Sequence, residues 1–135
     1  MGKRKNILLV EDDPDISLSV AFRLRNQGYG VQVVEDGKNG LRIALENIPH
    51  LLILDLMLPD LSGEEICKAI REHEDEQIQK IPIIMLTAKS SQADAIVGRV
   101  IGANFYLTKP FSMDDLLGKI KVLADNEASE NFASF

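Results

Sequence analysis

Residues 51–59 read LLILDLMLP, and this stretch decides the fold. An unbroken run of Leu and Ile that ends near a proline is typical of a strand buried in a parallel sheet. Asp55 closes the run, and in folds of this class ligands bind at the carboxyl ends of the strands. The stretch therefore predicts a central strand that presents a carboxylate at the ligand-binding edge of a sheet.

A second acidic group ends another apolar run. Residues 7–10 read ILLV, and Glu11, Asp12 and Asp13 follow directly. If the two strands are parallel neighbours, these carboxylates converge with Asp55 at one edge of the sheet. Two like charges about 4 Å apart repel by roughly 4 kcal/mol at an effective dielectric constant of about 20. The cluster needs a compensating charge, and a divalent cation is the natural candidate.

The composition fits one soluble domain. The chain has 135 residues, and its hydrophobic content of 45% is enough for an ordinary core. A net charge of −6 argues against direct binding to nucleic acid, which depends on clustered Lys and Arg. No apolar run reaches the roughly 18 residues of a membrane span, and the run after the basic N-terminus is too short for a signal peptide. We therefore expect a cytoplasmic protein, with its single cysteine, Cys67, in the core.

Short apolar runs alternate with amphipathic segments along the chain. The alternation predicts an α/β fold, an all-parallel sheet with helices on both faces, because right-handed crossovers place the helices there. The expected strands are 6–10, 31–34, 51–54, 82–86 and 105–107, and the expected helices are 14–26, 38–46, 64–73, 90–101 and 112–123. The polar stretch 74–80 is expected as a connection, and 124–135 as a disordered acidic tail.

Four motifs, each at the end of a predicted strand, resemble the receiver domain of two-component response regulators. They are VEDDP at 10–14, LDLMLP at 54–59, LTA at 86–88 and TKPF at 108–111. The resemblance covers roughly residues 5–123, almost the whole chain. Within the family, the chain is similar to single-domain receivers of the chemotaxis type. It implies a flavodoxin-like fold with five strands in the order 2-1-3-4-5 and five helices, and a receiver domain over residues 1–123.

The resemblance also implies how the acidic edge works. Asp55 would accept a phosphoryl group from a phosphohistidine on a sensor histidine kinase or phosphotransfer protein. Glu11, Asp12 and Asp55 would hold Mg²⁺ together with the Met57 carbonyl, which agrees with the preference of Mg²⁺ for oxygen ligands. Asp13, in contrast, is expected to cap the helix that begins at Pro14. Such a domain is not a conventional enzyme, although it catalyses its own phosphorylation and dephosphorylation.

Three further residues have roles that the resemblance implies. Lys109 would supply a positive charge to the phosphoryl oxygens, and Thr87 a hydroxyl donor. In the switch of this family the Thr87 hydroxyl moves toward the phosphoryl group, and an aromatic side chain, here Tyr106, fills the vacated space. The responding surface would be the 90–123 face, where a downstream protein or a second copy binds. A cis peptide bond is expected before Pro110.

The chain departs from many transcription-factor receivers on this output face. Two acids are common where Asn104 and Phe105 stand here, and a basic residue is common near Gly118. Those residues form charge pairs across a dimer, so we do not expect that dimer in this chain. Our hypothesis is that Phe105 belongs to an apolar patch for a partner.

The sequence leaves one alternative open and disfavours three others. The chain can be a receiver fragment of a larger regulator or hybrid kinase. An aspartyl-phosphate phosphatase normally has a second Asp two positions after the nucleophile, where Met57 stands here. A flavin-binding protein of this fold needs a phosphate loop after the first strand, which is absent. A phosphorylation-independent interaction module is disfavoured because Asp12, Asp55, Thr87 and Lys109 are all intact.

Overall fold

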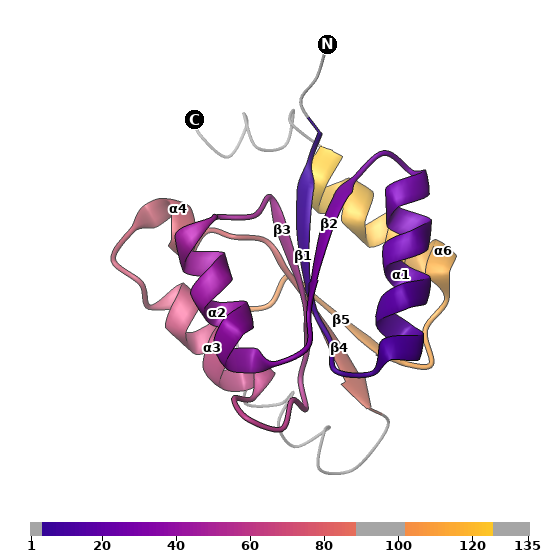
Figure 1. Cartoon of the computed structure of the whole chain (residues 1–135). Coiled ribbons are helices and arrows are strands. Elements are labelled where there is room, and N and C mark those ends of the chain that lie inside the picture. The colour runs from indigo at the N-terminus through magenta and orange to yellow at the C-terminus, as the bar shows by residue number, and fades with distance from the viewer. Residues whose placement is uncertain (1–3, 89–101, 126–135) are drawn as a thin grey trace.

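The apolar runs pair side by side as one parallel sheet in the computed structural model, which describes residues 4–88 and 102–125. The sheet lies between two layers of helices (Figure 1). Its strands, in the order β2-β1-β3-β4-β5, are β1 Asn6–Val10, β2 Gly30–Val34, β3 Leu51–Asp55, β4 Ile83–Ala88 and β5 Phe105–Lys109. This order, with every described pairing parallel, confirms the predicted flavodoxin-like α/β fold.

Helices cover both faces of the sheet. They are α1 Pro14–Asn26, α2 Gly37–Glu46, α3 Gly63–Arg71, α4 Glu76–Gln79 and α6 Met113–Ile120, and a π-helical turn, η1 Lys121–Asp125, follows α6. The predicted helix 90–101 lies outside the described residues, as does the predicted tail from residue 126 onward. In the part of the chain that is described, no helix is long and apolar enough to cross a membrane.

The alternation of side chains along the strands divides the core into two clusters. Leu8 and Val10 of β1 pack with residues of α2, α3 and α4, whereas Ile7 and Leu9 pack with residues of α1 and α6. Successive side chains of a strand point to opposite faces, so a central strand needs apolar residues at every position. β3 meets this demand, since all of its residues are buried.

Several element boundaries differ from the sequence predictions, and one helix was not expected. β4 continues to Ala88 and β5 to Lys109, because the ladder pairs Thr87 with Thr108 and Ala88 with Lys109 beyond the last apolar residues. Thr87 and Lys109 therefore lie in strands and not after them. The stretch 74–80, expected as a connection, contains α4, whose Ile78 is buried at 4% exposure.

The last helix also differs, since its α-helical part ends at Ile120 and the π-helical turn continues the chain.

Arg71, at the end of α3, joins three segments of the chain. Its guanidinium donates hydrogen bonds to the carbonyl oxygens of Gln79 and Ile81, each at 2.8 Å, and to that of Gly102 at 2.6 Å. It also donates to Asn104 Oδ1 at 3.1 Å, and this same oxygen accepts from the Ile83 N–H at 2.8 Å. Arg71 thus fixes the chain that leads into β5 against the end of α3 and the start of β4.

Candidate functional site

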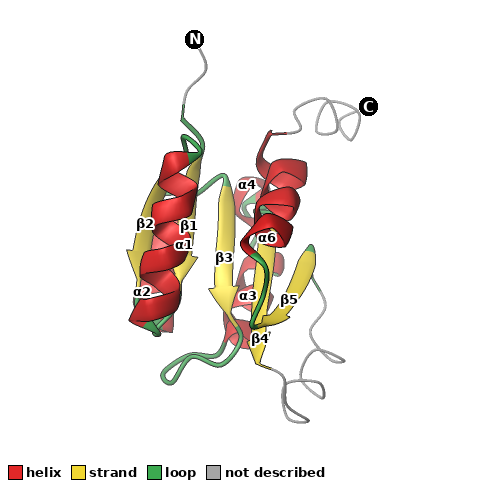
Figure 2. Cartoon of the chain, turned by 90° about the vertical axis from the view of Figure 1, so that its right-hand side faces the viewer, coloured by secondary structure: helices red, strands yellow, loops and turns green. Residues whose placement is uncertain are grey.

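The two-residue period of the strands brings three charged side chains to one face of the sheet. Leu9 pairs with Ile53 in the register of β1 and β3, so Glu11 and Asp55 are the next residues on that face. Lys109 follows Phe105 and Leu107, which pack in the same core cluster as Leu9. All three charged residues lie at the carboxyl ends of their strands, whose arrowheads point the same way in Figure 2.

Lys109 lies between the two buried carboxylates. Its Nζ is 2.8 Å from Glu11 Oε1 and 3.2 Å from Asp55 Oδ2. The side chain of Glu11 is 0% exposed and that of Asp55 is 6% exposed. Asp12, which is exposed, adds a third carboxylate, and one ligand oxygen from each of the three acids lies within 4.8 Å of the others. The predicted cluster of three carboxylates therefore exists, and the ammonium group of Lys109 lies between two of them, Glu11 and Asp55.

Glu11 has an unusual environment for a carboxylate. Burial outweighs the attraction of Lys109 and raises the pKa of Glu11 to about 7. Its Oε2 accepts a hydrogen bond from the Asp13 N–H at 3.1 Å, and its buried Oε1 forms an ion pair with Lys109 Nζ at 2.8 Å. The buried oxygen of Glu11 therefore depends on Lys109 for its compensating charge.

The pKa of Lys109 is also raised, but here the charged form is the one favoured. Burial alone lowers the pKa of the ammonium, but the neighbouring Glu11 and Asp55 carboxylates outweigh this effect and raise it above its ordinary value. Lys109 therefore stays charged throughout the physiological range.

The loop after β3 fixes Asp55 from its other side. Asp55 Oδ1 accepts a hydrogen bond from the Met57 N–H at 3.0 Å, and the Leu56 N–H donates to the Leu86 carbonyl at 2.8 Å. Met57 is 38% exposed, although its neighbours Leu56 and Leu58 are buried. The backbone that would supply the predicted Met57 carbonyl ligand is thus tied directly to Asp55.

Thr87 and Tyr106 lie on the other face of the sheet. Thr87 is 5% exposed and follows Leu86, which pairs with Asp55 in the register of β3 and β4. Tyr106 pairs with Met85 on β4, two residues before Thr87, so both side chains belong to the same face. Tyr106 is half-buried against the α2–α3–α4 side of the core, and this burial raises the pKa of its phenol.

Two smaller predictions concern the edges of the site. The Lys109–Pro110 peptide bond is cis, as the resemblance implied. Asp13 is the N-cap of α1, and its Oδ1 accepts a hydrogen bond from the Asp15 N–H at 2.9 Å. Its carboxylate serves the helix, in agreement with the role predicted for it.

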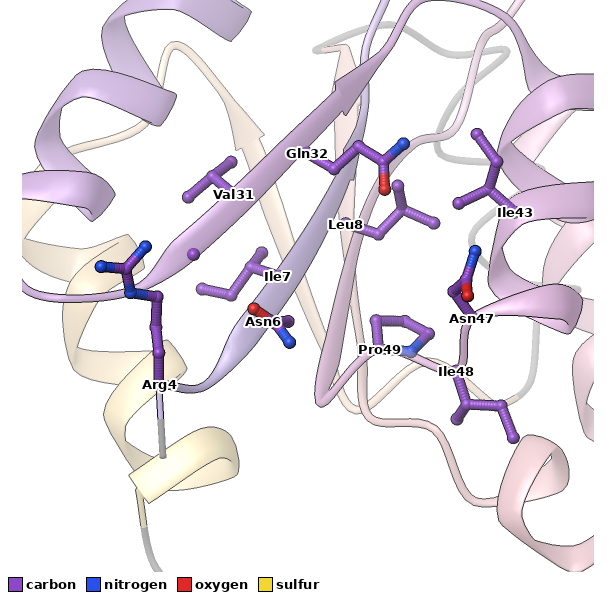
Figure 3. Close-up of a pocket in the computed structure, with 11 residues that line it drawn as sticks. Arg4, Asn6, Ile7, Leu8, Val31, Gln32, Ile43, Asn47, Ile48 and Pro49 are labelled. Carbon is purple, nitrogen blue, oxygen red and sulfur yellow. The ribbon is translucent and has the colours of Figure 1, made fainter. Parts of the chain in front are cut away.

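A hollow at the opposite end of the sheet contains none of this chemistry. It has a volume of about 530 Å³ around the amino ends of β1 and β2, with Arg4, Asn6 and Gln32 among its lining residues (Figure 3). Ile7 and Leu8, and likewise Val31 and Gln32, all line it, although adjacent strand residues point to opposite faces. The hollow therefore wraps around the edge of the sheet and is not a single enclosed site.

Known proteins share this sequence pattern and this fold. The family model of the response regulator receiver domain matches residues 7–121. The chain belongs to the response regulator receiver domain family. A receiver from Methanospirillum hungatei, described as CheY-like, matches with a TM-score of 0.81 and 29% identity, over 95% of this chain and 99% of that one.

Other receivers resemble this one equally in structure. The receiver domain of a sensor histidine kinase from Pseudomonas aeruginosa, described with a magnesium ion coordinated in its active-site cleft, matches with a TM-score of 0.81 and 33% identity. That match covers 92% of this chain and 100% of the Pseudomonas domain.

The curated relatives are longer proteins. The response regulator ArlR of Staphylococcus saprophyticus is 39% identical over 125 residues, which are 93% of this chain and 54% of ArlR. The DNA-binding dual master transcriptional regulator RpaA of Synechocystis is 42% identical over 117 residues, or 87% of this chain and 48% of RpaA. The chain thus spans about half the length of these relatives.

Proposed function

We propose that this receiver accepts a phosphoryl group on Asp55 from a phosphohistidine of a sensor histidine kinase or phosphotransfer protein. The observation that carries the proposal is the position of Lys109 Nζ, 3.2 Å from Asp55 Oδ2 and 2.8 Å from Glu11 Oε1. A cation held beside the acceptor carboxylate supplies positive charge where the phosphoryl oxygens arrive. Phosphoryl transfer depends chiefly on such charge stabilisation and on positioning.

In the transfer, an oxygen of Asp55 forms a bond to phosphorus while the phosphorus–nitrogen bond of the phosphohistidine breaks. The leaving imidazole nitrogen keeps the electron pair of that bond. Lys109 and the Thr87 hydroxyl then donate hydrogen bonds to the phosphoryl oxygens. Dephosphorylation is the attack of water on the same phosphorus, which returns the Asp55 carboxylate and releases inorganic phosphate.

The acidic cluster fits Mg²⁺, which Glu11, Asp12, Asp55 and the Met57 carbonyl would hold. The donors are all oxygens, as Mg²⁺ prefers, and the three carboxylates have ligand oxygens within 4.8 Å of one another. The buried Oε1 of Glu11 has Lys109 Nζ as its cationic partner, and a bound ion or a water molecule of its shell would share this oxygen. Bound Mg²⁺ would neutralise charge on the phosphoryl oxygens during transfer.

The response to phosphorylation would involve the face of the sheet that carries Thr87 and Tyr106. Thr87 would respond to the phosphoryl group, and Tyr106, on the same face, would move with it and alter the 90–123 face for a downstream partner or a second copy. The described parts of that face are β5 and α6. Phe105 is half-buried there, and Lys119 of α6 places its Nζ 5.4 Å from the centroid of the Phe105 ring. A partner patch that includes Phe105 stays a hypothesis, and unchanged partner affinity in Phe105→Ala would remove it.

A second candidate is a receiver within a larger regulator or hybrid kinase, favoured by relatives that are about twice as long. The receiver itself, with a net charge of −6, is not expected to contact nucleic acid even if such a regulator does. We place the protein in the cytoplasm and the receiver at residues 1–123, followed by a polar tail over 124–135. Ala124, at 3% exposure, packs against the core, so the packed part of the receiver extends one residue beyond the predicted boundary.

The proposal is tested by incubation with acetyl phosphate and Mg²⁺ followed by intact-protein mass spectrometry. We expect the mass of one phosphoryl group to be added, and the gain to vanish in Asp55→Asn. Asp13→Asn is the matched control, because this nearby carboxylate caps α1 and is expected to leave the gain intact. No gain in the folded wild-type protein at saturating Mg²⁺ would refute the phosphoacceptor role.

A further inference from the structure

Asp60, in the loop between β3 and α3, binds the first turn of α2. Its Oδ1 accepts a hydrogen bond from the Gly37 N–H at 2.8 Å, and its Oδ2 accepts one from the Lys38 N–H at 2.9 Å. N–H groups in the first turn of a helix have no partner within the helix. These bonds, that of Lys38 and then that of Gly37, hold the pKa of the Asp60 carboxyl below its usual value.

Gly37 lets the loop approach α2 closely. A Cβ atom at this position would collide with the Leu61 carbonyl oxygen and would lie 3.2 Å from Asp60 Oδ1. Any other residue at position 37 would therefore push the loop away from the helix. The contact between the loop and α2 thus rests on two independent features, a carboxylate with two hydrogen bonds and a glycine without a side chain.

The same loop carries Met57. Its base is closed by a hydrogen bond from the Gly63 N–H to the Leu56 carbonyl at 2.9 Å, and its first part is tied by the Met57 N–H to Asp55 Oδ1 at 3.0 Å. Asp60 lies three residues after Met57 and holds the outer part of the loop on α2. Met57 therefore lies between two carboxylates that fix the backbone on either side of it.

We infer that Asp60 is a positioning residue, which fixes the Met57 carbonyl beside Asp55 by anchoring the loop to α2 and so sets the affinity of the acidic site for Mg²⁺. The inference rests on the proposed function, because it takes the Met57 carbonyl as a ligand. Residues that orient metal ligands without contacting the metal typically change its affinity by about 10- to 100-fold when they are removed.

Asp36 provides a matched control on the same helix. It is the N-cap of α2, and its Oδ2 accepts a hydrogen bond from the Asn39 N–H at 3.0 Å. Both Asp36 and Asp60 therefore satisfy N–H groups in the first turn of α2, but only Asp60 belongs to the loop that carries Met57. Removal of either carboxylate weakens the helix start, and only removal of Asp60 releases the loop.

The experiment measures Mg²⁺ affinity by isothermal titration calorimetry, without a phosphodonor. We expect Asp60→Ala to weaken Mg²⁺ binding by about 10-fold, the low end of that range because Asp60 acts through the loop. Asp60→Asn keeps a neutral acceptor and should lose less, whereas Asp36→Ala should bind within about 2-fold of wild type. Gly37→Ala, which displaces the loop from the other side, should weaken binding in the same direction as Asp60→Ala.

Circular dichroism establishes that each variant is folded before titration. Unchanged affinity in Asp60→Ala overturns the inference, and so does an equal loss in Asp36→Ala, since the effect would then come from the stability of α2 alone. These outcomes leave the phosphoacceptor role of Asp55 untouched. If wild type itself bound no Mg²⁺, the proposed metal site would fail and this inference with it.

Discussion

Two half-buried cations, Lys109 and Arg71, hold the two ends of the segment that forms β5, but their partners differ in kind. Lys109 is the last residue of β5 and faces the carboxylates of Glu11 and Asp55. Arg71 donates to carbonyl oxygens and to the amide of Asn104 just before β5 begins. Among the described residues no carboxylate forms an ion pair with Arg71, so its partners are all neutral.

The partners determine what each cation can do. Burial lowers the pKa of Arg71, whereas the carboxylates raise that of Lys109 in spite of burial. Arg71 uses its donors on three backbone carbonyl oxygens and one side-chain amide oxygen, and it therefore acts as a structural joint. Lys109 neutralises only part of the charge around it and can turn toward an incoming anion.

The largest expected effect separates the two cations by reactivity. Lys109→Met should slow phosphorylation of Asp55 by acetyl phosphate by about 10²- to 10³-fold, the usual loss when one charge-stabilising donor is removed. Arg71→Met should change that rate by only a few-fold. Rates are measured by intact mass at saturating Mg²⁺ and below the melting temperature of each variant. Equal losses in the two variants would contradict the distinction.

The next prediction concerns stability, and here the loss of Arg71 has the large effect. Arg71→Met removes hydrogen bonds to Gln79, Ile81, Gly102 and Asn104, and leaves these oxygens to find other donors. We expect the free energy of unfolding to fall by about 3 kcal/mol, since a hydrogen bond to a charged group is worth about 1.5–3 kcal/mol and partial exposure lets water replace some of them. Urea denaturation measures the change.

Arg71→Lys is the control for this loss. A single ammonium cannot reach oxygens on three segments as the planar guanidinium does, so it should restore only a small part of the stability. Full recovery in Arg71→Lys would mean that charge alone, and not the fork of donors, holds the joint.

A smaller effect tests the site through its pH dependence. Because the pKa of Glu11 is about 7 in the folded protein and 4.5 ordinarily, the folded state binds more protons than the unfolded state between these values. The contribution of protonated Glu11 to stability is therefore complete below pH 4.5 and is lost as pH rises through about 7. We expect a loss of about 2 kcal/mol, within the limit set by about 1.4 kcal/mol for each pH unit.

Glu11→Gln should abolish this slope, because an amide does not titrate. Urea denaturation without Mg²⁺ at several pH values compares the two proteins, and the variant should be the more stable at pH 8. An identical slope in Glu11→Gln would assign the pH dependence to other groups.

Much of this arrangement was predictable, because it depends on local patterns. The apolar runs and their alternation with amphipathic segments determine a parallel sheet, and the motifs at the strand ends gave Glu11, Asp55 and Lys109. The common face of these three residues was also available from the sequence, since each continues the two-residue period of its own strand. The predicted roles of all the site residues stay predictions, namely those of Glu11, Asp12, Asp55, Met57, Thr87, Tyr106 and Lys109.

Other features depend on contacts that no local pattern records. Arg71 contacts Gly102 and Asn104, which lie 31 and 33 positions later in the sequence. Asp60 contacts Gly37, which lies 23 positions earlier. The helix α4 was missed because Ile78 is the only apolar residue in a polar stretch, too little for a periodic signal. The ends of β4 and β5 were set too early because hydrogen bonds to the neighbouring strand, and not apolar side chains, extend them.

The smallest effect makes the surroundings of Arg71 resemble those of Lys109. Asn104 Oδ1 accepts hydrogen bonds from the Ile83 N–H and from Arg71 Nη2, and Asn104→Asp keeps an oxygen for both bonds while adding a negative charge. We expect the free energy of unfolding to rise by about 1 kcal/mol at low salt, the upper range for partly exposed ion pairs. The gain should shrink in 1 M NaCl, where screening acts over about 3 Å.

The double variant Arg71→Met/Asn104→Asp tests whether the new charge acts through Arg71. Without the guanidinium the added carboxylate has lost its cation, so Asn104→Asp should then give no gain in urea denaturation and should cost stability. A gain that persists in the double variant would show that the carboxylate acts elsewhere, and a loss in the single variant would show that Arg71 prefers neutral partners. The rate of Asp55 phosphorylation should be unaltered in Asn104→Asp and should change by only a few-fold in the double variant, as in Arg71→Met, because neither side chain contacts Asp55 or Lys109.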